Sequence, residues 1–327
     1  MIDPRLNVLR VVASTGTITA AAASLGYTPS AVSHQLRALA RELKVPLLEP
    51  DGRNVRLTAA AATLLRRSDE LFAHWESIHA ELQQASGGGA GRLGLAGFST
   101  AASALLPAVA LAAMEEFPRS RIEIVEADPV VCVDMLLSQS VDVAVVVGGA
   151  ELPHSDDARF VQRPLLEDPL DLLVPREHRL ASQRSMLLED AADEPWLMDR
   201  PGSAHHQLVV TACAAAGFSP RHAHRVVEWD TGAALVAAGF GVALVPRLAR
   251  VPGEQDLVRV PLRGDPTPAR RVRTMIRAGT ARQPEIALAL RVLREVADDV
   301  SRPGHHGVDE PSAPPTMADV PPGAAPV

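Results

Sequence analysis

Apolar residues near the N-terminus recur with helical spacing in two short segments. Residues 4–13 predict a first helix that stops at a Ser-Thr-Gly sequence. Residues 18–25 predict a second helix, which Thr17 caps and Gly26 ends, and its alanines are small enough for close helix packing. The apolar face of the first helix consists of Leu6, Leu9 and Val12.

A third helix is predicted over residues 29–43. Thr28 is a suitable N-cap, and Pro29 stands at the first helical position, where its missing N–H is not needed. One buried stripe repeats at steps of four and three residues, which leaves the polar residues mostly on the other face. This stripe consists of Val32, Leu36, Leu39 and Leu43.

The next segment, PLLEPDGRNVRLT, has two short apolar runs on either side of Asp51 and Gly52. An Asp-Gly pair favours a tight β-hairpin. The hairpin would carry Arg53 at its tip and Arg56 on its returning strand. Residues 1–57 are therefore predicted to form a winged helix-turn-helix DNA-binding domain.

Residues 58–86 contain neither proline nor glycine and predict one long linker helix. Apolar and small residues recur there in the heptad pattern of a dimerising coiled coil. An amphipathic helix that packs on its own domain is the alternative. The expected seam consists of Leu57, Ala61, Leu64, Ser68, Leu71, Trp75, Ile78, Leu82 and Ala85.

Strand and helix patterns alternate beyond a glycine-rich, flexible hinge at residues 87–91. The strand RLGLAG precedes a helix expected over residues 99–116 and the strand RIEIVEA. A helix near residues 130–137 then leads to the apolar strand VDVAVVV. Such a fully apolar strand is typical of a sheet that is covered on both faces.

A second cycle of the same kind follows. The strand WLMD leads to a helix that ends near residue 216, then to the strand HRVVEW, a helix near residues 231–238 and the strand GVALVP. A late strand at residues 270–277 and a helix at residues 285–296 complete the pattern. Two similar halves joined by crossing strands predict a hinged, two-lobed α/β domain over residues 92–298 that resembles periplasmic binding proteins.

The charge of the chain is unevenly distributed. Residues 1–67 contain nine basic and four acidic residues, a net charge of +5, whereas the remainder carries −12. A basic head on an acidic body is what local binding of DNA phosphates predicts. The proline-rich residues 299–327 have no aromatic side chain and are expected to be disordered.

Other chemistry has weak support in the sequence. No nucleophile elbow, phosphate-binding loop or dinucleotide motif indicates an enzyme, and no cofactor is expected. No signal peptide or membrane-spanning run is present, so a cytoplasmic protein without a membrane partner is expected.

Cys132 and Cys213 are expected to be buried apolar residues, with a redox pair as the alternative. The histidines at positions 205, 206, 222 and 224 lack nearby metal ligands and are expected at the surface.

The string from Thr17 to Thr58 resembles the N-terminal domain of the LysR-type transcriptional regulators. An alanine-rich helix, a Ser-Ala-Val-Ser recognition helix and a Gly-Arg-x-Val-Arg-Leu-Thr wing carry this resemblance. It implies a homodimer or homotetramer that binds pseudo-palindromic promoter DNA, responds to a small-molecule effector and has RNA polymerase as a further partner. Thr28, Leu48, Pro50 and Ala61 depart from the common family pattern, so the operator is not transferable from relatives.

The DNA contacts are expected at the start of the third helix and on the wing, because a recognition helix presents its N-terminal residues to base edges. Arg37 is expected on a phosphate, and Arg53 in a narrow minor groove. The predicted DNA-binding residues are Thr28, Pro29, Ser30, Ser33, His34, Arg37, Arg53 and Arg56.

The effector is expected beyond the carboxyl ends of the strands, where helices begin. Backbone N–H groups and hydroxyls there favour an anionic or carbonyl group, so an anionic effector is the expectation. Simple helix capping is the alternative role of these hydroxyls. The predicted effector-binding residues are Ser99, Thr100, Asp128, Gly148, Pro201, Gly202, Ser203 and Trp229.

The sequence thus favours a ligand-controlled transcription factor. A small-molecule binding protein of the periplasmic type is the second interpretation, because the predicted body resembles such proteins. The basic head argues against it.

Overall fold

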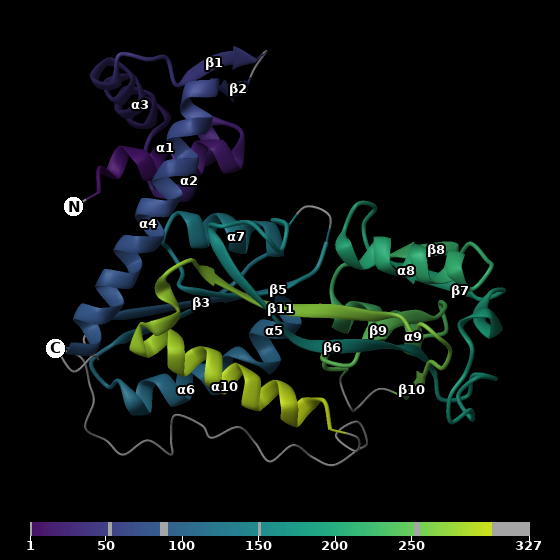
Figure 1. Ribbon diagram of the computed structural model, residues 1–327. Helices are drawn as coiled ribbons and strands as arrows, with labels where there is room; N and C mark the ends of the chain where they lie inside the picture. The colour runs from purple at the N-terminus through teal and green to yellow at the C-terminus, as the bar shows by residue number, and fades with distance from the viewer. Residues whose placement is uncertain (1, 52–53, 86–90, 150–151, 252–255, 303–327) are drawn as a thin grey trace.

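The computed structural model describes residues 2–51, 54–85, 91–149, 152–251 and 256–302. Figure 1 shows a small helical head that is joined by one long helix to an α/β body of two lobes. The predicted architecture, a winged helix-turn-helix head, a linker helix and a two-lobed domain, is confirmed.

The head consists of helices α1 (Pro4–Thr15), α2 (Ile18–Leu25) and α3 (Pro29–Leu43) and the hairpin of β1 (Leu48–Asp51) with β2 (Asn54–Leu57). Both predicted caps form, because the Thr17 and Thr28 side chains accept hydrogen bonds from backbone N–H groups one turn later. The expected stripe of α3 ends early. Leu43 is 42% exposed, since α3 stops there at Lys44, which has a left-handed backbone.

The linker helix α4 (Ala59–Ala85) is unbroken, but its expected seam is only partly free. Ala61 and Ser68 are buried inside the protomer, so the nine-residue seam is wrong at those two positions. The buried face instead includes Leu65 and Phe72. A narrower apolar stripe faces outward, and it consists of Leu71, Trp75, Ile78 and Leu82.

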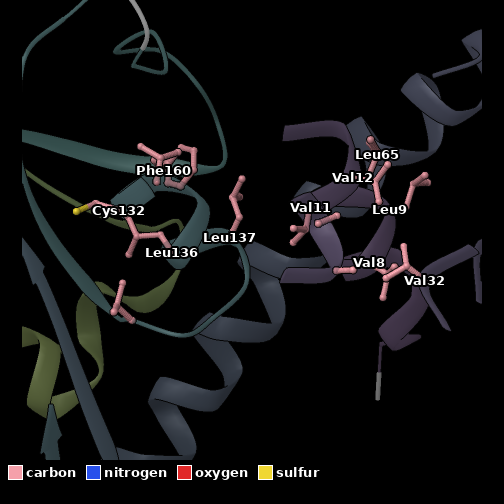
Figure 2. Packing of buried hydrophobic residues seen from close by; sticks show 14 of the residues in the cluster. Val8, Leu9, Val11, Val12, Val32, Leu65, Cys132, Leu136, Leu137 and Phe160 are labelled. Atoms are coloured by element: carbon pink, nitrogen blue, oxygen red, sulfur yellow. The ribbon is translucent and has the colours of Figure 1, made fainter. Parts of the chain in front are cut away.

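The head also contacts the first lobe directly. Val11 on α1 and Leu137 on α7 (Pro129–Leu137) belong to one buried cluster, and Figure 2 shows them at the boundary between the two parts. The Ser14 hydroxyl donates a 2.7 Å hydrogen bond to the Asp134 side chain on α7. The orientation of the head is thus set by contacts with the body as well as by α4.

The first lobe contains the sheet β4 (Arg121–Glu126), β3 (Arg92–Gly97), β5 (Val143–Val147) and β11 (Ala269–Arg277) in that order. Helices α6 (Leu106–Glu116) and α10 (Pro284–Val300) cover one face and α7 covers the other (Figure 1). The single helix expected over residues 99–116 is wrong. It divides into α5 (Ser99–Ala104) and α6 at Leu105, because Pro107 cannot donate a helical hydrogen bond.

One long strand, β6 (Phe160–Pro175), joins the lobes and was not predicted. Its first part pairs with β11, and its last residues pair with β9 (Ala243–Pro246) and β10 (Leu257–Pro261). Pro164 and Pro169 hide this strand in the sequence, since proline normally marks an edge or an irregularity. The register of β6 against β11 does shift beside Pro164, where a bulge tolerates the proline.

The second lobe adds β7 (Pro195–Met198), α8 (Ala204–Ala215), β8 (Arg221–Arg225) and α9 (Trp229–Ala237). The short helices η1 (Leu188–Ala191) and η2 (Thr280–Arg282) complete the described elements. The strand expected over HRVVEW is displaced toward the N-terminus. Trp229 begins α9 instead of ending a strand.

Among the described residues, no helix is both long and apolar enough to span a bilayer. Cys132 and Cys213 are buried free thiols, as predicted, and they lie in different core clusters. Burial raises the pKa of each thiol to about 12, which opposes formation of the reactive thiolate.

Candidate DNA-binding and effector sites

The N-terminal half of α3 presents polar side chains to solvent. Thr28, Pro29, Ser30 and His34 are exposed and Ser33 is half-buried, whereas Val32 and Leu36 hold the opposite face in the core of the head. Arg37 is exposed one turn later, and its Nε donates a 3.2 Å hydrogen bond to the Ser33 carbonyl oxygen. The helix therefore offers short hydroxyl and imidazole groups first and a guanidinium group behind them.

Some of these polar groups already form hydrogen bonds with one another at the start of α3. The Thr28 hydroxyl accepts a 3.2 Å hydrogen bond from the Ala31 N–H and lies 3.0 Å from the Ser30 hydroxyl. Thr28 thus fixes the start of α3 and the position of Ser30 together. A hydroxyl at this place has a structural function in addition to any contact with a base.

The wing carries an internal ion pair. Arg56 Nη2 lies 2.6 Å from Glu49 Oε1 across the hairpin, and both side chains are largely exposed. Arg53, the predicted tip residue, lies outside the described residues. The Arg56 guanidinium is therefore already paired with a carboxylate within the hairpin.

Replacing Glu49 by glutamine is expected to tighten DNA binding by about twofold, because an exposed ion pair contributes only a few tenths of a kcal/mol. The measurement is fluorescence anisotropy of a labelled duplex. Glu295→Gln removes a comparable exposed pair with Arg291 on α10 and is expected to have no effect. Equal affinity of Glu49→Gln and the wild type would show that Arg56 does not meet the DNA.

A cavity of about 1170 Å³ lies between the lobes, and all eight predicted effector residues line it. Ser99 and Thr100 begin α5, Asp128 precedes α7, and Gly148 follows β5. From the second lobe come the turn before α8 and the first residue of α9. The chain order of strands and helices thus brings five distant segments to one place. The second-lobe residues are Pro201, Gly202, Ser203 and Trp229.

The three predicted hydroxyls at the cavity have different partners. Ser203 caps α8 by accepting a 3.0 Å hydrogen bond from the His206 N–H. Thr100 is buried, and its Oγ1 accepts a 2.8 Å hydrogen bond from Arg270 Nη2. The Ser99 hydroxyl has no hydrogen-bond partner among the described residues, so it is the one most available to a ligand.

Sequence reasoning missed Arg270, which lies where β11 crosses between the lobes. Its guanidinium is 2.5 Å from Asp168 Oδ2 and lies over the Phe98 ring at 5.0 Å. Burial lowers the pKa of Arg270, although Asp168 opposes that shift. No sequence signal pairs Arg270 with Asp168, because the contact depends on the unpredicted strand β6.

His205 was expected at the surface, and that expectation is wrong. It lines the cavity, and its ring lies edge-on to Trp229 with centroids 4.9 Å apart. Its Nε2 lies 3.1 Å from the Leu244 carbonyl oxygen, which assigns the proton to Nε2. Burial, and next the charge of Arg270, lower the pKa of His205 to about 4, so the ring is neutral near pH 7.

The neutral His205 ring predicts a pH dependence of stability. The unfolded chain takes up a proton at His205 as the pH falls below about 6.5, whereas the folded chain does so only near pH 4. The contribution of the neutral His205 ring to the free energy of unfolding is therefore fully present above pH 6.5. It is lost as the pH falls from 6.5 toward 4. Urea unfolding midpoints across this window are expected to decline less in His205→Gln than in the wild type. Parallel declines would contradict the buried, neutral state of His205.

Two family models cover most of the chain. Residues 4–62 match the model described as "Bacterial regulatory helix-turn-helix protein, lysR family", and residues 86–298 match the model described as "LysR substrate binding domain". Among curated relatives, a probable nitrogen assimilation transcriptional activator of Synechococcus elongatus is 27% identical over 81% of this chain and 85% of its own length. The HTH-type transcriptional regulator MetR of Haemophilus influenzae is 29% identical over 76% and 78%, respectively.

Solved structures share the fold. Full-length OxyR from Pseudomonas aeruginosa is similar with a TM-score of 0.61 and 22% identity, and the match covers 91% of this chain and 94% of that one. CbnR in complex with its target DNA is similar with a TM-score of 0.52 and 23% identity, over 91% and 100%. These structures share the arrangement of head, linker helix and body that this chain has.

Proposed function

We infer that this chain, which belongs to the LysR family of bacterial transcriptional regulators, binds DNA through its head and alters that binding when a small molecule occupies the cavity between its lobes. The single observation that carries this proposal is the convergence of all eight predicted effector residues on that cavity. Such a regulator acts in the cytoplasm, where its DNA is.

The proposed DNA contacts are divided between bases and phosphates. Thr28, Pro29, Ser30, Ser33 and His34 are at the start of α3, the position from which a recognition helix reaches base edges in the major groove. Arg37 and Arg56 are placed to neutralise phosphates, and Arg53 to enter the minor groove. The likeness to CbnR, which was solved in complex with its target DNA, supports this mode of binding.

The proposed dimer contact is the outward stripe of α4. Leu71, Trp75 and Leu82 are 40–58% exposed at spacings that suit a second helix, with Ile78 between them. A large apolar stripe on an isolated chain is costly in water, so a second copy of the helix is the proposed cover. A symmetric dimer would read a pseudo-palindrome.

A physical connection joins the cavity to the linker helix. β11 holds Arg270 at the cavity and Arg277 at its other end, where Arg277 Nε donates a 3.1 Å hydrogen bond to Glu76 on α4. Two turns nearer the N-terminus, on the same face of α4, Arg10 of the head lies 3.1 Å from Asp69 and over the Phe72 ring at 3.9 Å. We propose that movement of β11 on ligand binding is transmitted through α4 to the head.

Selection from a random pool of duplex DNA tests the proposed function. The full chain is expected to enrich pseudo-palindromic sequences with half-sites about one helical turn apart. A Leu71→Glu/Leu82→Glu variant is expected to lose this enrichment together with dimer formation, whereas Glu116→Gln on α6 is expected to keep both. Absence of any enrichment would favour the small-molecule binding protein without a regulatory role.

A further inference from the structure

The wall of the effector cavity is rich in carboxylates. Two of its four carboxylates lie at the ends of strands, one in each lobe. The other two stand at the N-cap positions of α7 and α9, where their side chains make no capping hydrogen bond. Their charges therefore do not serve the helix ends through hydrogen bonds. The four carboxylates that line the cavity are Glu126, Asp128, Asp199 and Glu228.

The two arginines that line the same cavity are already neutralised. Arg270 is paired with the buried Asp168 and also donates to Thr100. Arg200 lies 3.3 Å from Asp128. Among the described residues, Glu126, Asp199 and Glu228 have no cationic partner within ion-pair distance, so three negative charges remain.

Helix ends do not reverse this balance. The N-termini of α7, α8 and α9 face the cavity, and each is equivalent to about half a positive charge. Together they offset about half of three full carboxylate charges, and Asp128 and Glu228 stand directly at two of these ends. The cavity remains negative, which disfavours the anionic effector expected from the sequence.

His205 and Trp229 provide the remaining recognition groups. Nε2 of His205 is engaged by Leu244, while Nδ1 is buried and has no hydrogen-bond partner. A buried acceptor without a donor is costly, so a ligand N–H that reaches Nδ1 is favoured. Trp229 adds an aromatic wall, which attracts organic cations through its π-face.

We propose that the effector is a small organic cation with N–H donors, such as a protonated amine, and not an anion. The ammonium group is balanced by Asp199, Glu126 and Glu228, its N–H satisfies His205, and its carbon skeleton lies against Trp229. This inference rests on the proposed function of the cavity as the effector site.

Matched pairs of probes test the charge class on the full-length protein. Putrescine is compared with succinate, and benzylamine with benzoate, by calorimetric titration at constant ionic strength. The amine of each pair is expected to bind at least about tenfold more tightly than its carboxylate, because charge-assisted hydrogen bonds are made only by the amine. In ¹⁵N spectra, the Nδ1 signal of His205 is expected to move toward that of a hydrogen-bonded nitrogen.

Variants assign the binding to this cavity. Asp199→Asn/Glu228→Gln is expected to weaken amine binding by about tenfold or more, whereas Glu116→Gln on the distant helix α6 is expected to leave it unchanged. Three results overturn the cation proposal: tighter binding of the carboxylates, no binding of either member, or amine binding that persists in the double variant. Tighter carboxylate binding that is lost in Trp229→Ala would leave the effector site in place. Failure of the wild type to enrich any DNA sequence in the selection experiment would separately reject the proposed function.

Discussion

Replacing Arg277 by methionine is expected to lower the free energy of unfolding by about 3–5 kcal/mol, the cost of leaving a buried charge without its partner. Arg277 is 8% exposed and contacts both Glu76, at 3.1 Å, and Asp142, at 2.9 Å. It also donates to the Val141 carbonyl oxygen. Methionine fills similar space but leaves two carboxylates buried without a cation.

Urea unfolding of the full chain measures this effect. Arg291→Met is the matched control, since Arg291 forms an exposed pair with Glu295 on α10 and its loss is expected to cost at most about 1 kcal/mol. Similar losses in the two variants would show that the Arg277 cluster is not a buried network. The Arg277 variant is also expected to respond less to effector, because the contact between β11 and α4 is gone.

Replacing Gly279 by alanine is expected to cost about 2–4 kcal/mol, from backbone strain and from overpacking together. Gly279 has a φ of +90°, which L side chains rarely adopt, and an added Cβ would lie inside contact distance of the Ala73 carbonyl oxygen on α4. The linker helix would have to move away from the first lobe. Weaker DNA binding is expected along with the lower stability.

Gly232→Ala is the control for this glycine. Gly232 lies inside helix α9, where an added Cβ meets only Val226 Cγ1 at 3.7 Å, an ordinary contact. Alanine is the better helix former, so this variant is expected to be neutral or slightly stabilising. If the two variants have the same thermal unfolding midpoint, the close approach of Gly279 to α4 does not contribute to the position of the linker helix.

The head was predictable because its signals are local. Thr17 and Thr28 predict the starts of helices, and Gly26 predicts the end of one. Asp51 with Gly52 predicts the turn of the wing. The helix positions of Ser99 and Ser203 after short strands likewise placed two walls of the cavity. These features depend on residues within a few positions of one another.

The remainder of the site depends on contacts between distant segments. Arg270 meets Asp168 only because β11 pairs with β6, and the prolines of β6 conceal that strand. His205 is buried only because α8 faces Trp229 and Leu244, which follow it by more than twenty residues. Ala61 and Ser68 of α4 are covered by packing within the protomer, which a heptad pattern does not distinguish from packing on a partner.

Salt titration of DNA binding tests whether the head binds a specific duplex with α3 in the major groove. The duplex enriched by selection is titrated with the wild type and with Arg37→Ala across a range of salt concentrations, beside a scrambled duplex. We expect that the logarithm of affinity falls linearly with the logarithm of salt, that the scrambled duplex binds more weakly, and that Arg37→Ala reduces the slope by about one. Equal affinity for both duplexes, with the same slope in the variant, would contradict this mode of binding.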